Sequence, residues 1–253
     1  NAEDREIVSL DGLEMLSALD TLRIRRRNQL SDISLLAQIS TLTAVALDNN
    51  PIADFSPLAT MTQLTGLWIR GEEIPDDISF VADLTNLETL LFIESSVSDI
   101  SPVANLTNLT ILWIRNNEIT DISSVANLTS LELLNLSSNM ISDISPVADL
   151  TALTFLGLGD NQISDISAVA NLTAVTSLPL NDNEIIDISA LENLTELNVF
   201  GLDNNQITDL TPLVDNAGLG TDDTVSVIGN PLSAEATSTQ IPAPEARGVI
   251  VNQ

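Results

Sequence analysis

Tryptophan and arginine are scarce in this sequence and occur together in two related segments. The 253 residues include two tryptophans and eight basic residues, all of which are arginine. Trp68 precedes Arg70 in the segment GLWIR, and Trp113 precedes Arg115 in the segment ILWIR. Both residue types are enriched at the energetic centres of binding interfaces, and arginine binds carboxylate or phosphate through paired hydrogen bonds. We therefore expect these segments to bind a ligand if the fold brings them to one face.

The composition argues against catalysis. The chain contains no histidine, cysteine or lysine. It therefore lacks the commonest general base and transition-metal ligand, as well as thiol nucleophiles, disulfides and zinc-finger ligands. Aspartate and glutamate occur throughout the sequence, so their spacing identifies no acid–base pair. We predict that the protein is not an enzyme and needs no cofactor.

The charge and hydropathy limit the classes of partner. A formal net charge of -28 opposes binding to nucleic acid and to anionic membranes, and its self-repulsion favours a monomer. No apolar run reaches the length of about 18 residues that a transmembrane helix needs. The first residues, NAEDREIV, are unlike a signal peptide, so we expect a mature chain or a fragment.

An apolar pattern with a period of 22 or 23 residues runs through most of the chain. Its template, L-x-x-L-x-L-x-x-N-x-I-x-x-I, is matched by Leu109, Leu112, Ile114, Asn117, Ile119 and Ile122. The L-x-L core predicts a short parallel strand with its leucines inward and the intervening residues outward. Each coil can bury its apolar face only against its neighbours. We therefore predict an α/β right-handed solenoid with a curved parallel sheet on its concave face and short 3-10 or extended convex segments.

Polar residues at fixed positions are expected to hold the coils together. Asparagine in the template can donate its amide to neighbouring backbone carbonyls, although Arg27, Glu72 and Ser95 occupy that position in repeats one, three and four. Aspartate follows in most units and is well placed to cap a short helical turn. An acidic column of this kind could also hold calcium, and capping is the favoured interpretation.

The repeats divide the chain into three parts. Nine repeats of 22 or 23 residues are assigned to residues 19–218. Residues 1–18 are expected to form an N-terminal cap, and residues 219–253 a degenerate repeat with a C-terminal cap. Together these parts would make one domain.

Units such as NNEITDISSVANLTSLELL and DNQISDISAVANLTAVTSL resemble the 22-residue leucine-rich repeats of bacterial internalins over residues 10–232. The resemblance implies a leucine-rich-repeat fold and a secreted or cell-surface protein that binds a host receptor through its concave sheet. It implies an extracellular location for this chain. The sequence departs from better-known internalins because it shows no cell-wall anchor and no immunoglobulin-like domain.

The outward residues of the strands form columns across the predicted sheet. Trp68, Leu91 and Trp113 fall in one column and would form an apolar strip roughly 10 Å long, because neighbouring strands lie about 4.8 Å apart. Four other apolar residues would widen this strip, and four arginines would flank it: Ile93, Ile111, Leu133 and Phe155, with Arg23, Arg25, Arg70 and Arg115.

We therefore predict a non-catalytic binding module that recognises a protein through the N-terminal half of the concave sheet. An anionic polysaccharide is an alternative ligand, because indole faces stack on sugar rings while arginine pairs with anionic groups. A structural spacer of a larger protein is a further alternative. The strip would then be an incidental patch in which arginines neutralise nearby acids such as Glu94.

Overall fold

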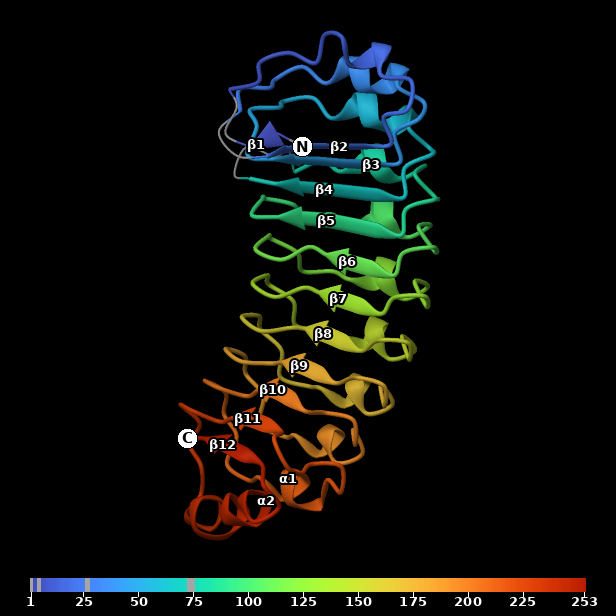
Figure 1. Cartoon of the computed structure of the whole chain (residues 1–253). Helices are drawn as coiled ribbons and strands as arrows, with labels where there is room; N and C mark the ends of the chain where they lie inside the picture. Colours follow the sequence, from blue (N-terminus) through green and yellow to red (C-terminus); the bar gives the residue numbers. More distant parts are fainter. Residues whose placement is uncertain (1, 4–5, 26–27, 72–75) are drawn as a thin grey trace. The chain divides into compact units, whose positions relative to one another are not determined.

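The computed structural model describes the chain apart from residues 1, 4–5, 26–27 and 72–75. It contains two compact units, residues 1–119 and 120–253, and each is described by itself. Both units consist of coils in which a short strand alternates with a short helical turn (Figure 1). None of the helices in the described part of the chain is long and apolar enough to span a membrane.

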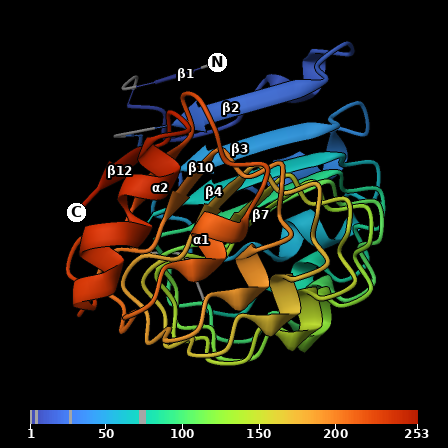
Figure 2. The same cartoon turned by 90° about the horizontal axis from the view of Figure 1, so that it is seen from below.

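The first unit has a parallel sheet whose strands follow one another in chain order (Figures 1 and 2). The strands are β1 (Ala2–Glu3), β2 (Thr21–Arg25), β3 (Ala44–Asp48), β4 (Gly66–Arg70), β5 (Thr89–Ile93) and β6 (Ile111–Trp113). The 3-10 helices that lie between them are η1 (Leu13–Met15), η2 (Ser34–Gln38), η3 (Ser56–Thr60), η4 (Ser79–Val81) and η5 (Ser101–Val103).

The second unit repeats this plan and ends differently. Its strands, again parallel, are β7 (Leu133–Asn135), β8 (Phe155–Gly157), β9 (Ser177–Pro179), β10 (Val199–Gly201), β11 (Thr224–Ser226) and β12 (Ile250–Asn252). Its 3-10 helices are η6 (Ser123–Val125), η7 (Ser145–Val147), η8 (Ser167–Val169) and η9 (Ser189–Leu191). The last coils carry α1 (Thr211–Asp215), the π-helical turn η10 (Ala236–Gln240) and α2 (Pro242–Glu245).

The apolar template residues form the core of each unit. Leu109, Leu112, Ile114 and Ile119 are completely buried, and the equivalent described residues of the other repeats from one to nine are buried as well, apart from the half-buried Leu19. The outward residues between them stay at least partly exposed in most coils, as the period of two in a strand requires. The predicted leucine-rich-repeat solenoid fold is therefore confirmed.

Asparagine side chains connect consecutive coils as predicted. The Asn183 amide donates to the backbone carbonyls of Leu158 and Leu180 at 3.0 and 3.1 Å, and its Oδ1 accepts from the Ile163 N–H at 2.9 Å. Asn230 makes the same bonds in the degenerate tenth unit. Each buried amide thus satisfies backbone groups of two coils that would otherwise lack partners.

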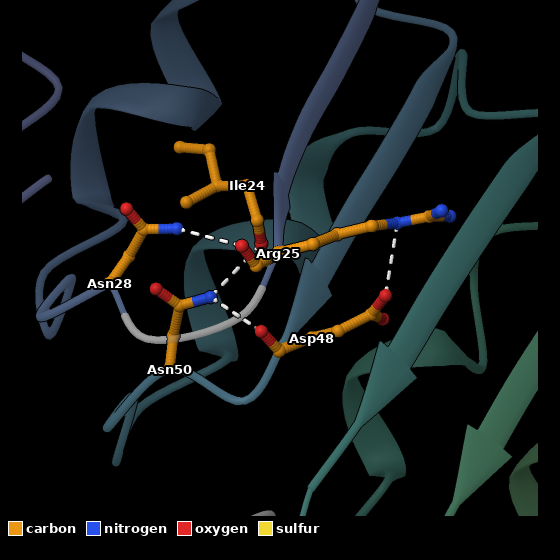
Figure 3. Close-up of polar contacts among 5 residues, drawn as sticks. All are labelled: Ile24, Arg25, Asn28, Asp48 and Asn50. Carbon is orange, nitrogen blue, oxygen red and sulfur yellow. Dashed lines mark hydrogen bonds and ion pairs between the residues drawn. The ribbon is translucent and has the colours of Figure 1, made fainter. Parts of the chain in front are cut away.

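The first repeat corrects one part of this prediction. Asn28, not Arg27, is the ladder residue: it is buried and donates to the Arg25 carbonyl at 3.0 Å (Figure 3). It also accepts from the Ile7 N–H at 3.0 Å. This repeat has one extra residue, which moves the asparagine by one position. Arg27 and Glu72 lie outside the described residues, and Ser95 holds the ladder position of repeat four.

The aspartate column acts one residue earlier than predicted. In Asp143-Ile-Ser, the residue at the N-cap of η7 is Ile144, and the Asp143 carboxylate accepts the Ser145 N–H at 2.8 Å. This is an Asx turn, in which a side chain bonds to backbone two residues further on. The hydrogen bonds from Ser145 lower the pKa of Asp143, and the same contact lowers the pKa of Asp99 and Asp165. These three aspartates therefore hold the start of their helical turns while their carboxylates are charged.

The N-terminal coil buries Leu10 but leaves three apolar side chains largely exposed: Val8, Met15 and Leu16. The η1 turn itself buries none of its residues. The boundaries predicted for the caps and the repeat region stay predictions.

Candidate functional site

The first unit places Trp68, Leu91 and Trp113 side by side on its sheet. Trp68 of β4 pairs with Leu91 of β5, and Leu91 pairs with Trp113 of β6. All three side chains are half-buried, so part of each faces solvent. We call these three residues the apolar strip. Ile111, which pairs with Thr89, is half-buried beside it.

Gly66 shapes the position of the first indole. A side-chain Cβ at residue 66 would collide with the six-membered ring of Trp68, because that ring lies directly over the glycine. Residues 66 and 68 point to the same face of β4. The absence of a side chain at Gly66 thus lets the indole lie flat against the strand.

Arginines and acids alternate along the next row of the sheet. The paired positions on β2, β3, β4 and β5 are Arg25, Asp48, Arg70 and Ile93. Arg25 Nε lies 2.9 Å from Asp48 Oδ2, and Figure 3 shows the Arg25 side chain extended over β3 to reach it. This ion pair holds the guanidinium above the sheet and compensates its charge.

Arg70 forms a second, two-point ion pair. Its Nε donates to Glu94 Oε2 at 2.9 Å and its Nη2 donates to Glu94 Oε1 at 2.6 Å. The Arg70 hydrogen bonds lower the pKa of Glu94, and the same bonds raise the pKa of Arg70. A bidentate pair fixes the plane of the guanidinium as well as its position.

Glu94 occupies a backbone conformation that its residue type rarely adopts. Its φ is 64°, in the left-handed region. The equivalent turn residues in other coils are Asn49, Gly71, Asn116, Ser138, Asp160, Asp182, Asn204 and Gly229. Most of these are types that tolerate positive φ. Glutamate here indicates a requirement for the longer carboxylate that reaches Arg70.

The other two predicted arginines lie at the ends of this region. Arg23 of β2 is exposed and Arg115, just after β6, is half-buried. Within the part of the chain that the structure describes, no ion pair involves either residue. Among the described residues of these rows, four arginines and two acids, Asp48 and Glu94, leave an excess of positive charge in a protein whose net charge is -28.

A shallow hollow of about 150 Å³ lies between the ion pairs and the apolar strip. Trp68, Leu91, Ile69 and Ile93 supply its apolar lining, and Arg25, Asp48 and Arg70 supply its polar lining. Ile93 is 6% exposed, so it contributes to the floor of the hollow and adds little open surface. This differs from the expectation that Ile93 widens an exposed strip.

Two predicted residues belong to the second unit. Leu133 of β7 pairs with Phe155 of β8, and both side chains are half-buried. They form an apolar pair on the sheet of that unit. The predicted set is therefore brought together in two groups, one in each unit.

The aspartates of the acidic column form Asx turns by accepting backbone N–H groups, as Asp143 does from Ser145. Among the residues that the structure describes, no group of three or more aspartate or glutamate side chains is arranged to hold a metal ion. The calcium alternative gains no support from this geometry.

Comparison with known proteins places this fold among bacterial repeat proteins. The family model described as leucine-rich repeats in two copies matches residues 85–127 and 129–171. An internalin, inlF, from Listeria monocytogenes is 31% identical over 99% of this chain and 79% of its own, with a TM-score of 0.85. This chain belongs to the internalin family.

Two further solved structures are similar to this internalin. Internalin C2 of Listeria monocytogenes is 34% identical over 74% of this chain and 80% of its own, with a TM-score of 0.68. A leucine-rich-repeat protein of Leptospira interrogans, at 19% identity, shares the fold alone: 92% of this chain and 72% of that one are covered, with a TM-score of 0.59. None of the curated proteins compared with the chain matches it.

Sequence reasoning about this internalin missed two residues of the site, Gly66 and Asp48, and named Glu94 only as an acid that arginines neutralise in an incidental patch, without pairing it with Arg70. The repeats contained a signal for Glu94, because the turn position holds asparagine, aspartate, serine or glycine in repeats two, three and five to ten. Asp48 stands between Arg25 and Arg70 in the column after the strip residues. Neither signal identifies a partner without side-chain geometry.

Proposed function

We propose that this internalin binds a protein partner through the face of the first unit that carries Trp68, Leu91 and Trp113. Leucine-rich-repeat folds are generally protein–protein interaction modules with extended binding surfaces. Binding would be non-catalytic, with the apolar strip as the anchor. Ile111 would extend that anchor, and the arginines would orient the partner.

One observation carries the proposal: the two tryptophans of the chain lie on the two strands that flank the strand of Leu91, and each is half-buried on the same sheet. Continuous apolar surface of this kind usually marks an interaction site. The Arg25–Asp48 and Arg70–Glu94 pairs support a protein partner over an anionic polysaccharide, because their guanidinium charges are already compensated.

We also propose that the protein acts as a monomer at the cell surface or after secretion. The resemblance to internalins supports this location, and the net charge of -28 supports the monomer through self-repulsion.

A peptide-library selection tests the proposal. A random-peptide phage library is first depleted on the Trp68→Ala, Trp113→Ala double variant and then selected on the wild type. Affinities of the enriched peptides are measured for the wild type and for Leu91→Ala. The matched control is Ile186→Ala, which removes an aliphatic side chain that is 59% exposed in the second unit.

Protein recognition by this face predicts peptides that lose about tenfold or more in affinity with Leu91→Ala and none with Ile186→Ala. Their binding should survive moderate salt, because apolar contacts dominate it. Equal binding to all variants would contradict the proposal. Binding only to sulfated polysaccharides, with a steep loss as salt rises, would favour the glycan alternative.

A further inference from the structure

We propose that the hollow between β2 and β5 receives one aromatic side chain from an extended segment of the partner, with acidic residues three positions before and three after it. This inference rests on the proposed function and specifies the partner's chemistry.

The size and lining of the hollow fit one ring. Its volume is about 150 Å³, and a cavity of about that volume accommodates benzene. Leu91, Ile93 and the Trp68 indole, which lies flat against β4, supply apolar lining. Aromatic rings pack favourably against indole and against guanidinium groups. Arg25 and Arg70 line the remaining sides.

The charges around the hollow disfavour an ionic side chain within it. Arg25 pairs with Asp48 at 2.9 Å, and Arg70 pairs with Glu94 at two points. An additional carboxylate or ammonium would lose hydration there and would gain little, because each nearby charge already has a partner. An apolar ring loses no ionic hydration and covers the apolar floor.

The flanking arginines set the positions of the acids. Arg23 lies on β2 and Arg115 just after β6, so each is about two strands from β4, which supplies three of the lining residues. Two strand spacings amount to about 10 Å. Three residues of extended chain span a similar distance of about 10 Å. A segment that crosses the strands would therefore bring carboxylates to both arginines.

Charge complementarity restricts such a segment to this face. The remainder of the protein is strongly acidic and would repel a partner segment that carries two carboxylates. Among the described residues of strands β2 to β6 and the turns that follow them, four arginines (Arg23, Arg25, Arg70 and Arg115) outnumber their two acidic partners, Asp48 and Glu94. The same segment would therefore bind weakly elsewhere.

Defined peptides test the proposal on the full chain. The probe is the capped peptide EGSFGSE, and the matched controls are EGSAGSE, KGSFGSK and GSEFEGS, in which the ring, the charge sign and the spacing are changed in turn. Binding is followed by tryptophan fluorescence and by chemical-shift changes in the protein. We expect each control to bind about tenfold more weakly than the probe.

Protein variants connect the peptide charges to particular arginines. Arg23→Gln and Arg115→Gln should each weaken EGSFGSE about threefold or more, and should leave QGSFGSQ unchanged. Equal effects on both peptides would overturn the assignment of these arginines.

The outcomes also separate this inference from the proposed function. Selected library peptides that depend on Leu91 but lack the acidic–aromatic pattern would overturn the inference and leave the proposed function standing. Failure to obtain any Leu91-dependent peptide would contradict both. Binding of EGSAGSE with the affinity of EGSFGSE would show that the hollow receives no ring.

Discussion

Glu94 shows how a single residue departs from the repeat in favour of the site. Its φ of 64° is costly for glutamate, and its carboxylate holds Arg70 through two hydrogen bonds. Asparagine visits the left-handed region far more readily. The choice of glutamate is therefore explained by the orientation of Arg70, and local backbone preference opposes it.

Glu94→Asn should leave the unfolding free energy unchanged or raise it by up to about 2 kcal/mol. The substitution relieves a left-handed strain of about 1–2 kcal/mol and removes an exposed ion pair worth about 0–1 kcal/mol. Urea unfolding measures the change. A loss of more than about 2 kcal/mol would contradict this account, because it would show that Glu94 is retained for the stability of the fold.

Gly66→Ala should displace the Trp68 indole and cost about 1 kcal/mol, at the lower end of overpacking penalties, because the ring can rotate away. Near-ultraviolet circular dichroism and fluorescence report the ring's environment. The matched control is Gly201→Ala in β10, where an added Cβ would meet only ordinary contacts with Asn181. An unchanged indole signal in Gly66→Ala would refute the packing of the ring on this glycine.

The helical turns depend on charged aspartates. A folded-state pKa below the ordinary value gives stability that is present above that value and is lost as pH falls through the folded pKa. Asp143 has such a lowered pKa because it accepts hydrogen bonds from Ser145.

The advantage of the wild type over Asp143→Asn should be full above about pH 4, the ordinary aspartate pKa, and should disappear at lower pH. Asparagine can retain the Asx turn but carries no charge, so the comparison isolates the carboxylate. Urea unfolding of both proteins from neutral to acid pH gives the difference. An advantage that grows on acidification would contradict this account of the turn.

Asn183→Ala should cost about 2–4 kcal/mol, because buried carbonyls and an N–H in two coils lose their partner. Those groups are the Leu158 and Leu180 carbonyls and the Ile163 N–H. Asn193→Ala is the control, because that residue is exposed. Equal unfolding free energies for the two variants would show that the ladder adds nothing to stability.

Across the whole molecule, repetition made much of the fold predictable. A 22-residue period fixes which residues face inward and which positions pair on neighbouring strands, so the Trp68–Leu91–Trp113 register followed from counting. The same logic failed at Asn28, where one extra residue shifts the ladder, and at the aspartates, where the capping position is set by turn geometry.

Side-chain partners were less predictable than strand positions. The repeat places Arg70 and Ile93 in the same column but does not show that Arg70 reaches Glu94 or that Ile93 forms the floor of a hollow. These outcomes depend on rotamers and on neighbours in adjacent coils. The outward columns therefore identify a candidate face, and atomic geometry identifies its chemistry.

The central claim is that both indoles face solvent from the sheet of the first unit, where a partner can reach them. Acrylamide quenching of Trp113→Phe and Trp68→Phe, which retain one tryptophan each, tests it most directly. We predict that each remaining indole is quenched clearly more than a core indole and that both variants stay folded. Shielded, unquenched emission from either residue, with unfolding on its substitution, would place that tryptophan in the core and contradict the binding face.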